Sequence, residues 1–124
     1  MLIKESAENY LEAILAITRK EGSVRSIDIA NHLGVSKPSV SVAMKSFREE
    51  GYISVDAGGD ITLTEKGMEI AAKIFERHQI IAKALMALGV DEETAFEDSC
   101  KIEHDISNQT FEKLKAYLML HNII

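Results

Sequence analysis

The sequence lacks several features that would place the protein in other classes. It has one cysteine, Cys100, so no internal disulfide framework is possible, as is usual in a reducing compartment. No segment approaches the roughly 20 consecutive apolar residues that cross a bilayer. The first ten residues, MLIKESAENY, lack the basic start and apolar run of a secretory signal. With no internal repeat or low-complexity tract either, we expect a soluble cytoplasmic protein.

Length and composition fit one domain, or two small units that share a core. The chain has 124 residues, of which 46% are hydrophobic. Its net charge is −6, whereas nucleic-acid-binding domains are usually basic. The charge is uneven, however: residues 19–48 hold six basic and two acidic side chains, and residues 64–124 hold seven and eleven. Because the basic charge is concentrated in one segment, nucleic-acid binding is not excluded.

Hydrophobic spacing and capping residues predict a mainly α fold. Helices are expected at about 6–20, 26–33, 36–51, 64–88, 91–106 and 107–124. The expected N-caps are Ser26, Ser36, Thr64, Asp91 and Ser107. Two β-rich runs, 52–55 and 61–63, flank the turn sequence AGGD and predict a hairpin.

The order helix, helix, short turn, helix and β-hairpin predicts a winged helix-turn-helix in residues 1–63. Its packing residues are expected to be Ile27, Ile29, Ala30, Leu33, Val40, Met44 and Phe47. The start of its third helix is polar and basic, and such helices meet base edges and phosphates there. The predicted DNA contacts are therefore Ser36, Lys37, Pro38, Ser39, Ser41 and Lys45. A winged helix used only for protein contact is the alternative.

Side chains of the kinds that bind metals lie on helix faces predicted to be buried. Cys100, Glu103 and His104 are spaced i, i+3 and i+4, so they share one face of the predicted helix 91–106. Both faces of this helix carry apolar residues, and a buried carboxylate at Glu103 needs a charged partner or a metal.

Two other predicted helices carry polar groups beside small or apolar residues. Asn9 and Glu12 share a face of the first helix, and His78 lies on an apolar stripe of the fourth. Each alone is more often a solvated or core residue, and cysteine often behaves as a small hydrophobe. Together, Cys, His and Glu on three helices are the ligand set of a divalent transition metal. His32 and His121 show no such arrangement and are expected at the surface.

Five segments of the sequence are distinctive: SAENYLEAI, DIANHLGVSKPSVSVAMKSF, LTEKGMEIA, RHQII and CKIEHDIS. In these segments the sequence resembles the diphtheria toxin repressor family, in particular its short manganese transport regulator branch. The resemblance implies a homodimeric repressor whose metal-loaded form binds palindromic operator DNA of metal-uptake genes. We expect a DNA-binding domain in 1–63, a helical metal-binding and dimerisation domain in 64–124, and no SH3-like third domain.

The resemblance also implies which residues bind the metal. It places ligands at Glu12, His78, Cys100, Glu103 and His104, and at Asn9, where the family has aspartate or methionine. In the manganese branch, two metal ions are bridged by the residues at positions 12 and 100. Glu12 matches that branch, whereas Cys100 matches the iron-responsive branch. The ancillary site of the iron branch is not expected, because Ala82 and Phe96 replace its carboxylate and histidine.

The mixed ligand set leaves the metal open between Fe2+ and Mn2+, with one or two ions per subunit. A thiolate is soft and favours iron, whereas the glutamates are hard and suit manganese; we expect a slight preference for Fe2+. Without metal, Glu12, Glu103 and a Cys100 thiolate would repel one another, and metal would draw their helices together.

Two other functions stay open at this point. A metalloenzyme would need an open coordination position and a substrate cleft, and no nucleophile–base pair or phosphate-binding glycine loop is evident. A winged-helix regulator that responds to an organic effector, or to none, would bind its operator regardless of chelator. The helices at 91–106 and 107–124 are expected to supply either a dimer interface or a monomer core, through Ile102, Ile106, Phe111, Leu114 and Leu118.

Overall fold

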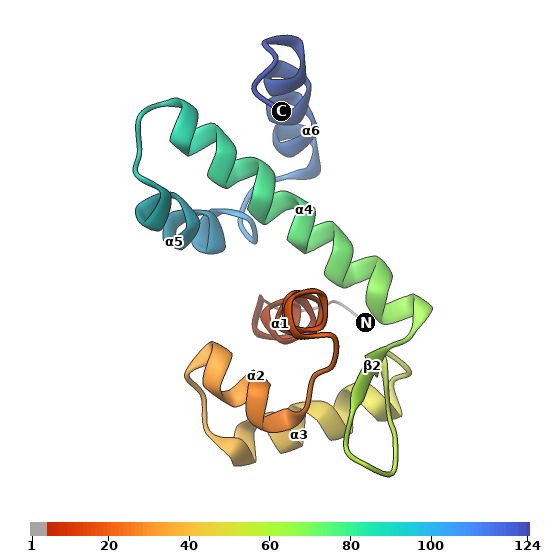
Figure 1. Cartoon of the computed structure of the whole chain (residues 1–124). Helices are drawn as coiled ribbons and strands as arrows, with labels where there is room; N and C mark the ends of the chain where they lie inside the picture. Colours follow the sequence, from red (N-terminus) through yellow and green to blue (C-terminus); the bar gives the residue numbers. More distant parts are fainter. Residues whose placement is uncertain (1–4) are drawn as a thin grey trace. The chain divides into compact units, whose positions relative to one another are not determined.

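Six helices and one antiparallel β-hairpin make up the computed structural model, which describes residues 5–124 (Figure 1). The helices are α1 (Glu5–Glu21), α2 (Ser26–Leu33), α3 (Lys37–Glu49), α4 (Glu65–Ala87), α5 (Glu92–Ile102) and α6 (Asn108–Leu120). The strands β1 (Ile53–Val55) and β2 (Ile61–Leu63) lie between α3 and α4. None of these described helices is long and apolar enough to cross a membrane. The mainly α fold class is confirmed.

The chain divides into two compact units, and the boundary, between Lys73 and Ile74, lies inside α4. The first unit holds α1, α2, α3, the hairpin and the start of α4. The second holds the rest of α4 with α5 and α6. Compactness alone defines this division, and the functional boundary between residues 63 and 64 stays a prediction.

The first unit is a winged helix-turn-helix, as predicted. Gly34 ends α2 in the left-handed region, at φ 67°, where glycine carries no steric penalty. The Ser36 hydroxyl then caps α3 by accepting the Ser39 N–H at 3.3 Å. Fully buried apolar side chains from three helices form the core, among them Leu11, Ile14, Ile29 and Val40.

Two local predictions in this unit are wrong. Ser26 does not cap α2; Arg25 holds the cap position with an extended backbone, and its N–H donates to the Asp28 carboxylate at 2.9 Å. Ile27 is 41% exposed and is not a core residue. It lies two positions from the fully buried Ile29, and in a helix residues two apart do not face the same side.

The hairpin is joined to α4 by close backbone packing. The strands pair with Ile53 opposite Leu63. The Thr64 hydroxyl donates to the Gly51 carbonyl at 2.6 Å and accepts the Gly67 N–H at 3.2 Å, so it caps α4 as predicted. A Cβ atom at Gly67 would lie 2.0 Å from the carbonyl oxygen of Tyr52, which only glycine permits.

The second unit has its own apolar core. Ile80 of α4 packs with Phe111 and Leu118 of α6, all buried. Asp91 and Ser107 cap α5 and α6 as predicted, accepting the N–H groups of residues 94 and 110 at 2.9 and 3.1 Å. Of the two roles considered for Phe111 and Leu118, the structure assigns both residues to this monomer core.

Helix α5 ends at Ile102, one turn before the predicted end at residue 106. The carbonyls of Glu103 and Ile106 accept from the Arg77 guanidinium at 3.1 and 3.2 Å. In this turn, the Arg77 guanidinium therefore donates to carbonyls that backbone N–H groups would bond in a helix. The spacing of residues along α5 could not indicate this contact. Helix α6 likewise stops at Leu120, before the expected chain end.

We predict that Gly67→Ala destabilises the protein, although alanine favours helix by about 1 kcal/mol over glycine. The added methyl group must displace the Tyr52 carbonyl, and overpacking of this kind costs about 1–3 kcal/mol. Chemical denaturation measures the change. Glu69→Ala, at an exposed position of the same helix, is the control and should alter stability by less than about 0.5 kcal/mol. Unchanged or higher stability of Gly67→Ala would contradict the close packing.

Candidate metal centre

Three predicted ligands converge within the second unit. The Nδ1 atom of His78, on α4, lies 3.0 Å from Oε2 of Glu103 and 3.5 Å from Sγ of Cys100. The hydroxyl oxygen of Ser99 lies 2.8 Å from the same nitrogen. An imidazole nitrogen, a carboxylate oxygen and a thiol sulfur are thus gathered around one point.

Glu103 is the most deeply buried member of this group. Its side chain is 0% exposed, and its Oε1 atom accepts no hydrogen bond from any residue that the structure describes. The Nε2 atom of His104 lies 3.3 Å from Oε1, on a side chain that is 1% exposed. The expected burial of Glu103 is therefore observed, and both histidines face its carboxylate.

The positions of these side chains follow from how α4 and α5 pack. Ser99 and Cys100 lie in the last turns of α5, and Glu103 follows as its C-cap, with its N–H bonded to the Ser99 carbonyl at 3.0 Å. Arg77 holds the turn that carries Glu103 and His104. The ring of Phe96 lies against that of His78, with centroids 5.3 Å apart. Arg77 and Ser99 are supporting residues that the sequence did not single out, because isolated Arg and Ser carry no metal-ligand pattern.

The ionisation of His78 reflects these neighbours. Burial lowers the pKa of His78. Hydrogen bonds to Cys100 and Glu103 and the negative charges of these groups have the larger, opposite effect, so the pKa rises to about 10. His78 is therefore protonated near neutral pH in the metal-free protein. A ligand nitrogen must be deprotonated, so metal binding through Nδ1 releases this proton.

The donor set fits a divalent transition metal. Imidazole, carboxylate and thiolate are the side-chain ligands of Fe, Co, Ni and Zn, and carboxylate also suits Mn. A buried carboxylate oxygen without a hydrogen bond is costly unless a cation compensates it.

The remaining predicted metal ligands lie in the first unit. Asn9 and Glu12 are three residues apart on α1, so they share one face of that helix, and both are half-buried. His32 and His121, expected at the surface, are exposed.

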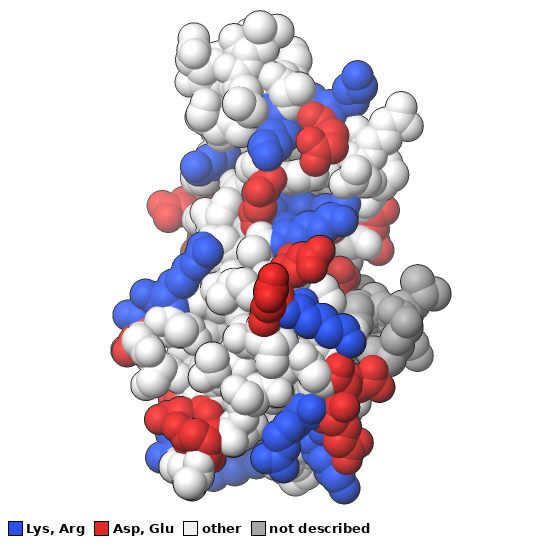
Figure 2. All heavy atoms as spheres, turned by 90° about the vertical axis from the view of Figure 1, so that its right-hand side faces the viewer, with Lys and Arg blue, Asp and Glu red and all other residues white. Residues whose placement is uncertain are grey.

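All six predicted DNA contacts are exposed, at the N-cap of α3 or within that helix: Ser36, Lys37, Pro38, Ser39, Ser41 and Lys45. A hollow of about 320 Å³ adjoins them, lined by Lys37 and Ser41 together with Arg25, Ser26, Ile27 and Gly59. Arg25 donates to the carbonyl of Gly58 in the hairpin turn at 2.6 Å, a contact the sequence did not predict. Figure 2 shows the side of the molecule that lies to the right in Figure 1, where basic side chains are interspersed with acidic ones.

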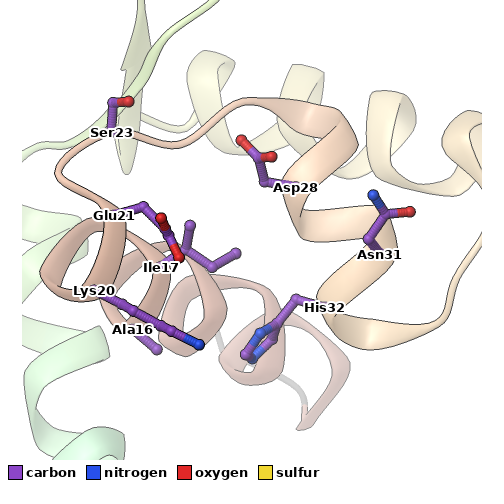
Figure 3. A pocket seen from close by; sticks show the side chains of 8 residues that line it. All are labelled: Ala16, Ile17, Lys20, Glu21, Ser23, Asp28, Asn31 and His32. Atoms are coloured by element: carbon purple, nitrogen blue, oxygen red, sulfur yellow. The ribbon is translucent and has the colours of Figure 1, made fainter.

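A second cavity, of about 530 Å³, lies between α1 and α2 (Figure 3). Its lining includes Lys20 and His32, which can be cationic, and Glu21 and Asp28, which are acidic. None of the predicted metal ligands or DNA contacts lines this cavity.

Comparison with known proteins assigns both parts of the chain. Residues 2–58 match the family model described as iron dependent repressor, N-terminal DNA binding domain. Residues 64–120 match the model described as iron dependent repressor, metal binding and dimerisation domain. Together the two matches cover most of the chain.

Individual relatives agree with this assignment. The HTH-type transcriptional regulator MJ0568 of Methanocaldococcus jannaschii is 36% identical over 118 residues, covering 94% of each chain. The transcriptional regulator MntR of Escherichia coli is 33% identical over 118 residues, covering 95% of this chain and 76% of its own length. The solved manganese regulator SloR aligns with a TM-score of 0.78 and 27% identity over 95% of this chain. This chain spans about half of SloR, 54% of its length.

These matches confirm the predicted resemblance to the repressor family. They also confirm the prediction that the protein is a DNA-binding regulator and not an enzyme. They also confirm that the C-terminal part binds metal and dimerises. The chain belongs to the iron dependent repressor family, with a DNA-binding domain followed by a metal binding and dimerisation domain.

Proposed function

We propose that this regulator represses metal-uptake genes when Fe2+ or Mn2+ occupies a pocket formed by His78, Cys100, Glu103 and His104, completed by Glu12 and Asn9 of α1. The observation that supports this pocket is the convergence of Glu103 Oε2 and Cys100 Sγ on His78 Nδ1, within the domain matched as metal-binding. The functional boundary proposed is 1–63 for DNA binding and 64–124 for metal binding and dimerisation. The protein acts in the cytoplasm, where its DNA target lies and an exposed thiol stays reduced.

The residues of the pocket account for how metal would change the protein. When bound, a divalent cation supplies positive charge that offsets the carboxylates and the thiolate. His78 would bind it as a neutral imidazole through Nδ1, and Glu103 would supply a buried carboxylate oxygen. His78 lies on α4, the same helix whose first turn packs against the hairpin through Gly67. Helix α4 therefore connects the proposed metal pocket to the hairpin along the chain.

Two observations point to different metals. The thiol of Cys100 is soft and favours Fe2+, whereas Glu103 is hard and suits Mn2+, and the similar protein SloR is a manganese regulator. We propose a slight preference for Fe2+, with one or two ions per subunit.

Dimerisation is proposed to use the exposed side of α6. Two large apolar side chains three residues apart share this side: Tyr117, 58% exposed, and Leu120, 77% exposed. They differ from the buried Phe111 and Leu118, which fill the core of the same unit. Pairing of two such faces would bury apolar surface that a monomer leaves in water.

We predict that chelation abolishes specific DNA binding and that Fe2+ or Mn2+ restores it, measured by fluorescence anisotropy on an operator selected from random duplexes. His104→Ala and Glu12→Gln should weaken metal activation by more than the roughly 10–100-fold typical of losing a residue that only supports a ligand. His121→Ala, an exposed histidine, is the matched control. Equal DNA binding with and without metal would support a regulator that needs no metal and overturn the proposal.

Cys100→Glu is predicted to shift selectivity towards Mn2+, because it replaces a soft ligand with a hard one. The measurement is the ratio of the Mn2+ and Co2+ dissociation constants, with Co2+ as an air-stable substitute for Fe2+. Cys100→Ala is the control, since it removes the thiol without adding a carboxylate. A ratio that is the same in Cys100→Glu and the unaltered protein would exclude Cys100 as a determinant of selectivity.

Lys45→Ala is predicted to weaken operator binding and to reduce the slope of log Kobs against log salt by about 1, as loss of one phosphate contact requires. The exposed Lys113 on α6 offers a control of equal charge change. If both variants show the same slope as the unaltered protein, Lys45 does not contact DNA.

A further inference from the structure

Helix α3 carries one large apolar side chain on its solvent side. Val42 is 71% exposed, whereas the other valine of this helix, Val40, is fully buried. The remaining large apolar residues of α3, Met44 and Phe47, are buried as well. Single apolar side chains are common on protein surfaces, so exposure alone gives Val42 no role. Its place on the helix is the second observation that bears on its function.

Val42 lies at the centre of the face that points away from the core. The buried residues Val40, Met44 and Phe47 define the core face of α3. Successive residues of an α-helix are about 100° apart around the axis, so Val42 points roughly 200° away from Val40. The side chain is therefore directed into solvent and takes no part in holding the first unit together.

The neighbours of Val42 on this outward face are predicted DNA contacts. Residues three and four apart share a helix face, so Val42 lies between Pro38 and Ser39 on one side and Lys45 on the other. All of them are exposed. The hydroxyl of Ser39 lies 2.8 Å from that of Ser36, within the N-cap of the helix. Val42 thus occupies the middle of the surface that a recognition helix presents to the major groove.

The chemistry of a valine side chain limits what it can recognise in that groove. Val42 has no donor or acceptor, so it cannot hydrogen-bond to a base edge. The apolar group that base pairs expose in the major groove is the C5 methyl of thymine, and small apolar side chains contact it. A β-branched side chain in a helix has one strongly preferred rotamer. The methyl groups of Val42 are therefore held in one direction before DNA binds, which lowers the entropic cost of the contact.

We propose that Val42 contacts the methyl group of a thymine in the operator and sets a preference for thymine at that base pair. This residue adds an apolar base contact to the polar contacts predicted on α3. The role requires the DNA-binding domain, which the family assignment supplies, and does not depend on which residues bind the metal.

The test replaces thymine by deoxyuridine, which lacks only the C5 methyl group and keeps its base pairing. Each thymine of the selected operator is replaced singly, and binding by the full chain is measured by fluorescence anisotropy with Mn2+ present. We expect at least one replacement to weaken binding by about fourfold, as loss of one buried methyl group predicts. If the affinity responds to no thymine position, the proposal is wrong.

Val42→Ala assigns the methyl contact to this side chain. The variant should bind the thymine operator more weakly, and its affinity should no longer respond to deoxyuridine at the sensitive position. Val42→Thr, which keeps one methyl group in the same shape, should retain part of the response. Val35→Ala, the same deletion at an exposed position between α2 and α3, should respond like the unaltered protein.

Two outcomes would overturn the proposal once a sensitive thymine is known. The first is a full response to deoxyuridine in Val42→Ala, because another residue would then make the methyl contact. The second is a lower slope of log Kobs against log salt in Val42→Ala, since loss of a base contact alone leaves the number of phosphate contacts unchanged. A loss of folded protein would lower binding to both duplexes equally and would not imitate the expected change in their ratio.

Discussion

The second unit depends on the burial of the Glu103 carboxylate. A carboxylate without solvent exposure requires opposite charge and hydrogen bonds close by, because moving an isolated charge out of water is prohibitively costly. His78 supplies positive charge on one side of it, His104 lies on the other side, and Arg77 fixes the backbone that carries it. Oε1 accepts no hydrogen bond from any described residue, and a bound cation would compensate it.

Local features of the structure could be predicted from the sequence where local chemistry decides them. Ser36, Thr64, Asp91 and Ser107 begin their helices because a side-chain oxygen accepts an N–H three residues later. The burial of Glu103 followed from apolar residues on both sides of its helix. The hairpin followed from β-branched runs around two glycines.

Features fixed by distant partners could not be predicted in this way. The early end of α5 depends on Arg77, which is 26 residues from Glu103 and carries no helix-stop signal. Helical spacing shows that Phe111 lies on the apolar face of α6, but it does not show what covers that face. In the structure, Ile80 of α4 packs against Phe111, so this residue belongs to the core of its own chain. The contact of Ser99 with His78 joins residues 21 apart in the sequence, which helical spacing cannot indicate.

Arg77 holds the turn of residues 103–106 through main-chain atoms. It donates to two main-chain carbonyls, at residues 103 and 106, and a carbonyl is present whatever side chain a residue carries. The shape of the turn is thus largely independent of the identity of residues such as the exposed Asp105. Mutations in the turn can therefore alter the ligand set, and with it the choice of metal, without first having to rebuild the backbone that presents it.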